Sequence, residues 1–316
     1  MNSLLISCMR ALARCPLVLL HALGAPLGWA VYLASPSYRA RFKANAAQAG
    51  VPWQQARGAI AAAGRMVMEL PPLWLRPAGA ALPMPVHWEG AEHLQEALAP
   101  GRGLLLLTPH MGCFEVAGQS YAERFGENLA PITVLFRPAR KPWLRGLVEG
   151  ARRRPRLDTA PARLAGVRQM IRALRRGETV GLLPDQVPPE GQGVWAPFFG
   201  RPAYTMTLAA RLVQQTGCAL LVLWAERLPR GSGFRVRVAP LGEPLPGEPV
   251  AAAAAINRAM EGLILACPEQ YLWGYHRYKS PRAGAPAGHA AGEAEPHTAT
   301  RIAVPEVSQP DPRAPR

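Results

Sequence analysis

Short apolar runs separated by segments of helical periodicity constrain this chain more than any other feature of its sequence. The strand-like runs cover residues 103–107, 132–136, 180–183 and 218–226, and an alternating run covers 234–238. Helical periodicity is carried by residues 161–176, 204–215 and 250–267. Continuous apolar runs are typical of strands buried on both faces, as in parallel sheets. The pattern predicts an α/β fold with a mixed, largely parallel central sheet flanked by helices, in which 234–238 is a half-exposed edge strand.

The N-terminal part is apolar enough to interact with a membrane. No charged residue occurs from Pro16 to Ser37, and this run is long enough to approach a bilayer span. Arg10 and Arg14 precede it and basic residues also follow it, so the charge balance sets no orientation. We interpret the run as a hydrophobic anchor helix, either a single span or a helix in the plane of the membrane. A buried core helix is the alternative.

Composition divides the chain into three parts. Residues 1–40 form the anchor, and residues 41–282 contain all the predicted strands and form the folded domain. Within this domain, a helix over 52–76 is expected to be broken at Pro71 and Pro72. Residues 283–316 are rich in Ala, Gly and Pro and hold almost no large apolar side chain, so we expect a disordered tail.

The charge balance indicates anionic partners. The 316 residues contain 36 Lys and Arg against 21 Asp and Glu, a formal net charge of +15 at pH 7. Such a field attracts nucleic acid, acidic membrane surfaces, phosphorylated lipids or an acidic carrier protein. A nucleic-acid module would combine its basic residues with stacking aromatic residues or a recognition helix, and neither is visible, so no nucleic acid is expected as a partner. The five cysteines are scattered without a Cys-x-x-Cys pair, which argues against a disulfide framework or a conventional zinc site.

The most specific local feature is the segment LLLLTPHMGCFE. His110 follows directly after a predicted buried strand, and Glu115 comes five residues later in the expected first turns of a helix. Ligands of α/β sheets bind in the crevice at the carboxyl ends of the strands, so a substrate would reach His110 there. A carboxylate at Glu115 could accept the Nδ1–H of His110 and leave Nε2 as a general base. The alternative is a histidine that caps a helix beside an unrelated surface glutamate.

Two further groups of polar residues follow other predicted strands. Asp185 comes after the third strand, at the same edge as His110, and leads into a Pro/Gly-rich aromatic loop that offers apolar surface to an acyl chain. A capping aspartate before a packed surface loop is the alternative. Basic residues gather between 137 and 156. Arginines bind phosphate through paired donors, so this segment could hold a phosphorylated substrate; a solvated basic helix face is the alternative.

Together these segments resemble the lauroyl/myristoyl acyltransferases of lipid A biosynthesis, the late or secondary acyltransferases within the lysophospholipid acyltransferase superfamily. The resemblance extends to about residue 282. It rests on the apolar N-terminus, the His-x4-Glu block, the Phe136-Arg137-Pro138 strand end, the ARRRPR segment, the LLPDQ block and the closing WGYHRYK.

The resemblance implies a membrane-associated enzyme that transfers a fatty acyl group from acyl carrier protein to a hydroxyl of a lipid A precursor. His110 would be the general base, and Glu115 would orient it. The substrate-binding candidates are Arg137, Asp185 and either Arg152 or Arg154. No metal or cofactor is implied, because the thioester supplies the driving force. The resemblance also implies a place at the bacterial inner membrane, with the domain facing the cytoplasm and a phosphorylated glycolipid as acceptor.

Two alternatives remain open at this level. One is a glycerophospholipid or ornithine-lipid O-acyltransferase that uses the same histidine–carboxylate chemistry. The other is a basic membrane-surface binding protein without enzymatic activity. The presence of His110, Glu115 and Asp185 together favours an enzyme.

Overall fold

A computed structural model describes residues 2–136 and 154–282 of the chain. The expected disordered tail (283–316) and two of the substrate-binding candidates, Arg137 and Arg152, lie outside the described residues.

A seven-stranded sheet forms the centre of the described part of the chain. Its strands lie in the order β1 (Val86–Glu89), β9 (Phe234–Pro240), β8 (Ala219–Arg227), β2 (Leu104–Leu107), β5 (Thr179–Leu182), β3 (Ile132–Phe136) and β4 (Leu157–Pro161). All neighbouring strands pair in parallel except β8 and β9, which pair antiparallel. The predicted α/β class with a mixed, largely parallel sheet is confirmed.

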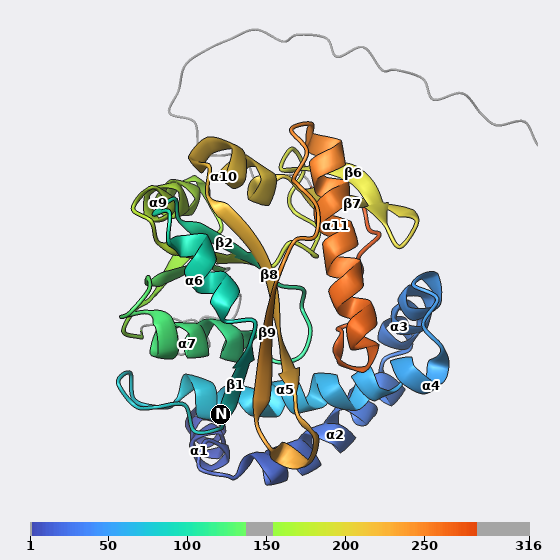
Figure 1. Ribbon diagram of the computed structural model, residues 1–316. Helices are drawn as coiled ribbons and strands as arrows, with labels where there is room; N and C mark the ends of the chain where they lie inside the picture. Colours follow the sequence, from blue (N-terminus) through green and yellow to red (C-terminus); the bar gives the residue numbers. More distant parts are fainter. Residues whose placement is uncertain (1, 137–153, 283–316) are drawn as a thin grey trace, which may run out of the picture. The chain divides into compact units, whose positions relative to one another are not determined.

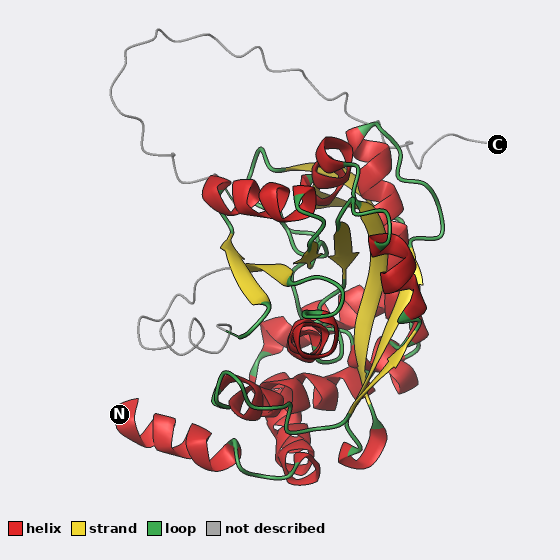
Figure 2. Ribbon diagram, turned by 60° about the vertical axis from the view of Figure 1, so that its left-hand side comes forward, coloured by secondary structure: helices red, strands yellow, loops and turns green. Residues whose placement is uncertain are grey.

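Helices cover both faces of this sheet (Figures 1 and 2). One face carries α6 (Glu92–Leu98) and α7 (Phe114–Phe125), and the other carries α9 (Leu164–Arg175), α10 (Leu208–Thr216) and α11 (Pro249–Ala266). The four leucines of β2 alternate between these layers, because successive side chains of a strand point to opposite faces. Leu104 and Leu106 join the apolar cluster under α7, whereas Leu105 and Leu107 join the cluster under α9 to α11.

The first five helices, up to residue 74, lie together at one end of the central sheet (Figure 1). They are α1 (Asn2–Leu12), α2 (Leu17–Ala34), α3 (Pro36–Gln48), α4 (Trp53–Ala56) and α5 (Gly58–Trp74). Helix α2 packs along α5 through glycines. A Cβ on Gly28 would lie 2.0 Å from the Ile60 carbonyl oxygen, and a Cβ on Gly64 would lie 2.0 Å from the Gly24 carbonyl oxygen. Only glycine permits this approach, so the glycines fix the position of α2 along α5.

The opposite face of α2 is apolar and exposed. It presents Val18, Leu19, Leu23, Leu27, Val31 and Leu33, of which Leu33 is 65% exposed. Among the described residues, α2 and α11 are the helices long and apolar enough to cross a membrane. Helix α11 packs into the core through residues such as Ile256 and Met260, which are fully buried.

Several details differ from the sequence-based expectations. Strand β9 is not an edge strand, because β1 pairs with its outer side. Helix α5 is not broken at Pro71 and Pro72 but continues to Trp74, with both prolines inside it. Strands β1 and β4 were not predicted, because VHWE and LDTAP carry no continuous apolar run. The predicted aromatic loop contains a hairpin of β6 (Gly193–Phe198) and β7 (Arg201–Met206).

Candidate active site

Sheet register brings His110 and Asp185 together. Strands β2 and β5 are parallel neighbours, and their last residues Leu107 and Leu182 lie opposite each other. His110 follows Leu107 by three residues, and Asp185 follows Leu182 by the same number. Because both strands end at the same edge, both side chains emerge into the crevice where α/β proteins bind ligands.

The two side chains form a short hydrogen-bonded pair. Asp185 Oδ1 lies 2.6 Å from His110 Nδ1, and Asp185 Oδ2 accepts the His110 backbone N–H at 2.9 Å. Burial of Asp185 would raise its pKa, but the His110 ring and backbone N–H hold that pKa below its usual value. An ionised Asp185 can only accept, so Nδ1 carries a proton and, in the neutral ring, the lone pair is on Nε2.

The expected role of Glu115 as the Nδ1 partner is therefore taken by Asp185. Glu115 lies in the first turn of α7, where a carboxylate interacts favourably with the helix dipole, and it lines the same cavity as His110. Asp185 lies at the edge of the sheet where the sequence predicts it, and its part in substrate binding stays a prediction.

The turn between β2 and α7 is fixed on several sides. Gly112 has a φ of +56°, and a Cβ there would lie 1.8 Å from the Ala225 carbonyl oxygen, so glycine is required. Its N–H donates to the Gln270 carbonyl at 3.0 Å, and the Cys113 N–H donates to the Ala225 carbonyl at 2.9 Å. The His110 carbonyl accepts from the N–H of Leu272 at 3.1 Å. His110 thus projects from a rigid turn.

Cys113 lies inside this turn and fits a packing role. It is fully buried, and burial raises the pKa of its thiol well above the usual value, so the reactive thiolate is disfavoured. Within 2–136 and 154–282, no group of three His, Cys, Asp or Glu residues is placed to hold a metal ion.

A cavity of about 810 Å³ opens beside His110. Its lining comes from both faces of the sheet. One part, which we call the α7 arm, runs under helix α7 and is lined by Ala117, Gly118, Tyr121, Ile132, Val134, Leu157 and Gly181. The other part is lined by residues of α9, α10 and β5, among them Leu164, Val167, Leu208 and Leu182. His110, Phe114 and Glu115 lie where α7 begins, so the α7 arm leads from His110 toward the far end of β3.

Arg154 is placed differently from what a substrate-binding residue requires. It is buried, and its Nη1 donates to the carbonyls of Arg76 and Pro77 at 2.7 and 2.8 Å. Its Nη2 donates to the Leu73 carbonyl at 2.8 Å. These carbonyls lie at and just beyond the end of α5, which lacks intrahelical partners for them. Arg154 is not among the residues that line the cavity, and this placement favours a structural role.

The closing WGYHRYK segment also has a structural part. Arg277 is buried and donates to the Tyr204 carbonyl at 2.8 Å and to Thr205 Oγ1 at 2.7 Å. These bonds tie the C-terminal segment to β7. Tyr271 lies beside Asp185, and burial together with that carboxylate raises the pKa of its phenol well above the usual value.

Comparison with known proteins gives a consistent result. Residues 1–280 match the family described as bacterial lipid A biosynthesis acyltransferase. The lipid A biosynthesis lauroyltransferase of Escherichia coli (strain K12) is 30% identical over 200 residues, 63% of each chain. The palmitoleoyltransferase of the same strain is 29% identical over 199 residues, 62% of each chain. A lipid A biosynthesis acyltransferase of Haemophilus influenzae is 24% identical over 184 residues, 58% of this chain and 56% of the relative.

The matched segment therefore spans less than two thirds of the length of these relatives, whereas the family match covers nearly all of this chain. The family match includes the segments that carry the motifs of the resemblance. The chain belongs to the bacterial lipid A biosynthesis acyltransferase family.

Proposed function

We propose that this protein transfers a fatty acyl group from an acyl carrier protein thioester to a hydroxyl of a phosphorylated lipid A precursor, with His110 as general base. One observation carries the proposal: a histidine whose Nδ1 is 2.6 Å from a buried carboxylate lies at the opening of a large apolar cavity. A carboxylate that holds the Nδ1 proton directs Nε2 to substrate and stabilises the imidazolium once it forms.

The chemistry needs no further reactant. The acceptor hydroxyl gives its proton to His110 Nε2 as its oxygen attacks the thioester carbonyl. The resulting tetrahedral oxyanion then reforms the carbonyl and expels the thiolate, which takes the proton from the imidazolium. The products are an ester and a free thiol. Asp185 stays ionised throughout and balances the charge of the ring.

The α7 arm has the properties of a site for the acyl chain. Gly118 lies inside helix α7 and Gly181 inside strand β5, two places where glycine is unfavourable. A Cβ on Gly118 would contact Val134 Cγ1 at 3.6 Å, and a Cβ on Gly181 would lie 3.2 Å from the same atom. Both glycines line the α7 arm beside Val134, so a side chain at either position would narrow it. Glycine at each position costs about 0.5–1 kcal/mol relative to alanine. A narrow apolar slot of this kind suits an unbranched hydrocarbon chain.

The exposed face of α2 supports attachment to a membrane. Six large apolar side chains on that face would be costly to leave in water, and no charged residue interrupts them. The inner face of α2 is held against α5 by glycine contacts and by His21, so we propose that α2 lies in the plane of the membrane. This arrangement fits a protein on the cytoplasmic side of the bacterial inner membrane.

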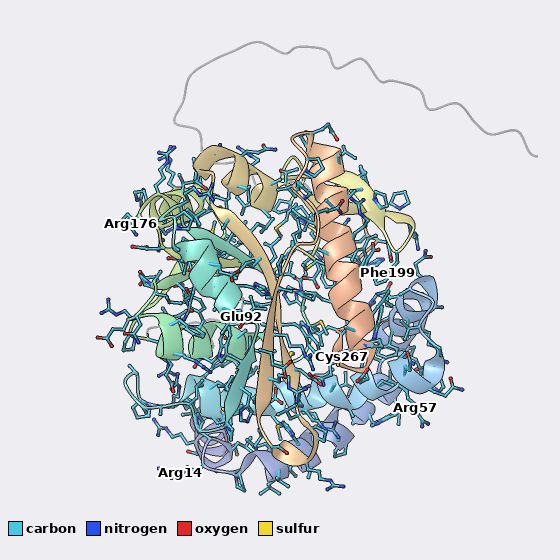
Figure 3. All side chains as sticks on the ribbon, viewed as in Figure 1. Arg14, Arg57, Glu92, Arg176, Phe199 and Cys267 are labelled. Atoms are coloured by element: carbon cyan, nitrogen blue, oxygen red, sulfur yellow. The ribbon has the colours of Figure 1, made fainter. Side chains whose placement is uncertain are left out.

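Helix α9 carries the charge that an acidic carrier protein requires. Arg168, Arg172 and Arg175 recur at helical spacing on its exposed face, and among the described residues none of them forms an ion pair. The first turn of α9 lines the cavity through Leu164 and Val167. Figure 3 shows Arg176, at the end of α9, far from Arg14, which precedes α2. We propose that the carrier docks on this arginine stripe from the aqueous side and delivers its thioester to the cavity.

Glu115, Arg137 and Arg152 remain predicted site residues. Glu115 lines the cavity and is a candidate for contact with the acceptor. Because Arg154 donates to the carbonyls at the end of α5, Arg152 becomes the better candidate of the pair for binding phosphate or stabilising the oxyanion.

The proposal is tested by purified full-length protein in detergent with labelled acyl carrier protein thioester and a panel of acceptors. We expect transfer to a phosphorylated lipid A precursor and a loss of about 10²–10⁴-fold in His110→Ala. Transfer to lysophosphatidate or a lyso-ornithine lipid instead would reassign the protein to the alternative acyltransferase class. Absence of transfer to any acceptor, with retained vesicle binding, would support the binding-protein alternative.

A further inference from the structure

A buried charged cluster lies outside the cavity and is not used in the proposed chemistry. It consists of His21 on α2, Glu69 on α5 and Arg227 at the end of β8, and Glu69 has no exposed surface. Arg227 Nη2 donates to Glu69 Oε2 at 2.7 Å, and Arg227 Nε donates to Glu69 Oε1. His21 Nε2 lies 2.7 Å from the same Oε1. Burying charges is costly, so a purely structural position would be served as well or better by apolar side chains.

The cluster reaches the His110 turn through Arg227. Its Nη2 also donates to the Gly112 carbonyl at 3.1 Å, two residues after His110. The Gln270 side chain holds the backbone of Arg227 by accepting its N–H at 2.8 Å and donating to its carbonyl at 3.0 Å. The Gln270 carbonyl also accepts the Gly112 N–H. One guanidinium, oriented by a buried carboxylate and by Gln270, thus holds the turn from which His110 projects.

The cluster also joins this turn to α2. Gly24 and Gly28 fix α2 on α5, and His21 lies one turn before Gly24 on the same buried face. In this position of α2, His21 Nε2 lies 2.7 Å from Glu69 Oε1. Hydrogen bonds through Glu69 and Arg227 therefore connect helix α2 to the turn that carries His110.

We propose that Glu69 and Arg227 are positioning residues for His110 and that His21 couples them to α2. The position of α2 on α5 then sets the orientation of the His110 ring. The proposal rests on the role proposed above for His110. A misplacement of about 1 Å at a reacting group can reduce the rate about 10²-fold, so a small shift of the turn has a large effect.

The decisive variant replaces the whole cluster by apolar side chains: His21→Leu/Glu69→Leu/Arg227→Met. Removing all three partners together leaves none of the three as an unpaired buried charge, and such replacements are often neutral or stabilising. We expect an unfolding temperature equal to or above that of the wild type, a fall in kcat of about 10²-fold and an unchanged KM for the thioester. His21→Leu alone should lower kcat by a smaller factor, because Arg227 keeps its bonds to Glu69 and Gly112.

Met260→Ala is the matched control. Met260 is fully buried on α11 and is neither a residue that lines the cavity nor a partner of the charged cluster, so its truncation lowers stability and leaves His21, Glu69 and Arg227 in place. We expect a lower unfolding temperature and a kcat close to that of the wild type. A kcat that instead falls with stability in this control would overturn the positioning role.

A second readout does not depend on turnover. The ring ¹⁵N resonances of His110, identified by their absence in His110→Ala, should shift in the triple variant and in His21→Leu but not in Met260→Ala. Unchanged His110 resonances and kcat in a folded triple variant would refute the proposal, and an unaffected His21→Leu would refute the coupling to α2. If the wild type transfers no acyl group but the resonances shift as expected, the proposed function fails and the positioning role stands.

Discussion

Asp185 Oδ1 lies 2.6 Å from His110 Nδ1, and Oδ2 of the same carboxylate accepts the backbone N–H of His110 at 2.9 Å. The carboxylate thus holds both the ring and the backbone of the proposed base. It can do so because β2 and β5 are parallel neighbours that end in register. His110 lies at the edge where the cavity opens, and the fold orients it before substrate arrives.

Filling the α7 arm should change the preferred acyl chain length. Gly118→Leu places a side chain between α7 and Val134, so we expect the preference among saturated acyl thioesters of increasing length to move to shorter chains. Gly262→Leu is the matched control, because Gly262 is an exposed glycine of α11 with no heavy atom within 4 Å of its Cβ position. An unchanged length profile in a folded Gly118→Leu protein would place the acyl chain elsewhere.

Reversing charge on α9 should weaken use of a carrier-bound donor. For Arg168→Glu/Arg172→Glu we expect KM for acyl carrier protein thioester to rise about ten-fold or more, because the docked surfaces would then repel. Turnover of a small acyl-pantetheine thioester should not change, since it lacks the acidic protein. Arg57→Glu/Arg102→Glu removes the same charge at exposed positions away from the cavity and should leave both donors unaffected (Arg57 is labelled in Figure 3). A parallel rise in KM for both donors would argue that α9 does not contact the carrier.

Acid should destabilise the protein through Glu69. Burial would raise the pKa of this carboxyl, but Arg227 and His21 lower it from 4.5 to about 2. A depressed pKa means that the unfolded chain binds the proton more tightly, so stability falls as pH decreases. The contribution is complete above about pH 4.5 and is lost as the pH approaches 2. Urea unfolding across this window should show a smaller pH dependence in His21→Leu/Glu69→Leu/Arg227→Met than in the wild type, and equal dependence would contradict the assignment.

Arg154→Met should affect stability and not substrate binding. It removes donors to the carbonyls of Leu73, Arg76 and Pro77, which lie at and just beyond the end of α5. A hydrogen bond from a charged group contributes about 1.5–3 kcal/mol to the free energy of unfolding, so we expect a clearly lower unfolding temperature. The KM for a phosphorylated acceptor should not change, because Arg154 is not among the residues that line the cavity. A large rise in that KM, with stability unchanged, would return Arg154 to the substrate-binding group.

The sequence predicts the strands that carry a continuous apolar run and the alternating strand β9, but it does not reveal β1 and β4. The runs at β2, β3, β5 and β8 were located within a residue or two, because burial on both faces leaves an unmistakable pattern. Strand β4 contains Asp158 and Thr159, and β1 contains His87 and Glu89, so neither resembles a buried strand. The order of strands in the sheet is set by packing between helices and cannot be read from periodicity.

The same limit explains the candidate site. His110 was found because a strand and a turn precede it in the local sequence. Local spacing alone predicts Glu115, five residues away, as the Nδ1 partner of His110. His110 and Asp185 each lie three residues after the end of a strand, but this equality becomes informative only when β2 and β5 are known to be neighbours. The Glu69–Arg227 pair, 158 residues apart, leaves no sequence signal at all.

The most direct measurement is the rate of acyl transfer in four proteins beside the wild type: His110→Ala, Asp185→Asn, His110→Ala/Asp185→Asn and Glu115→Gln. If Asp185 acts through His110, Asp185→Asn should lose about 10²–10⁴-fold in kcat, and the double variant should be no slower than His110→Ala alone. Glu115→Gln should lose less than Asp185→Asn. Additive losses in the double variant, or a greater loss in Glu115→Gln than in Asp185→Asn, would contradict the account.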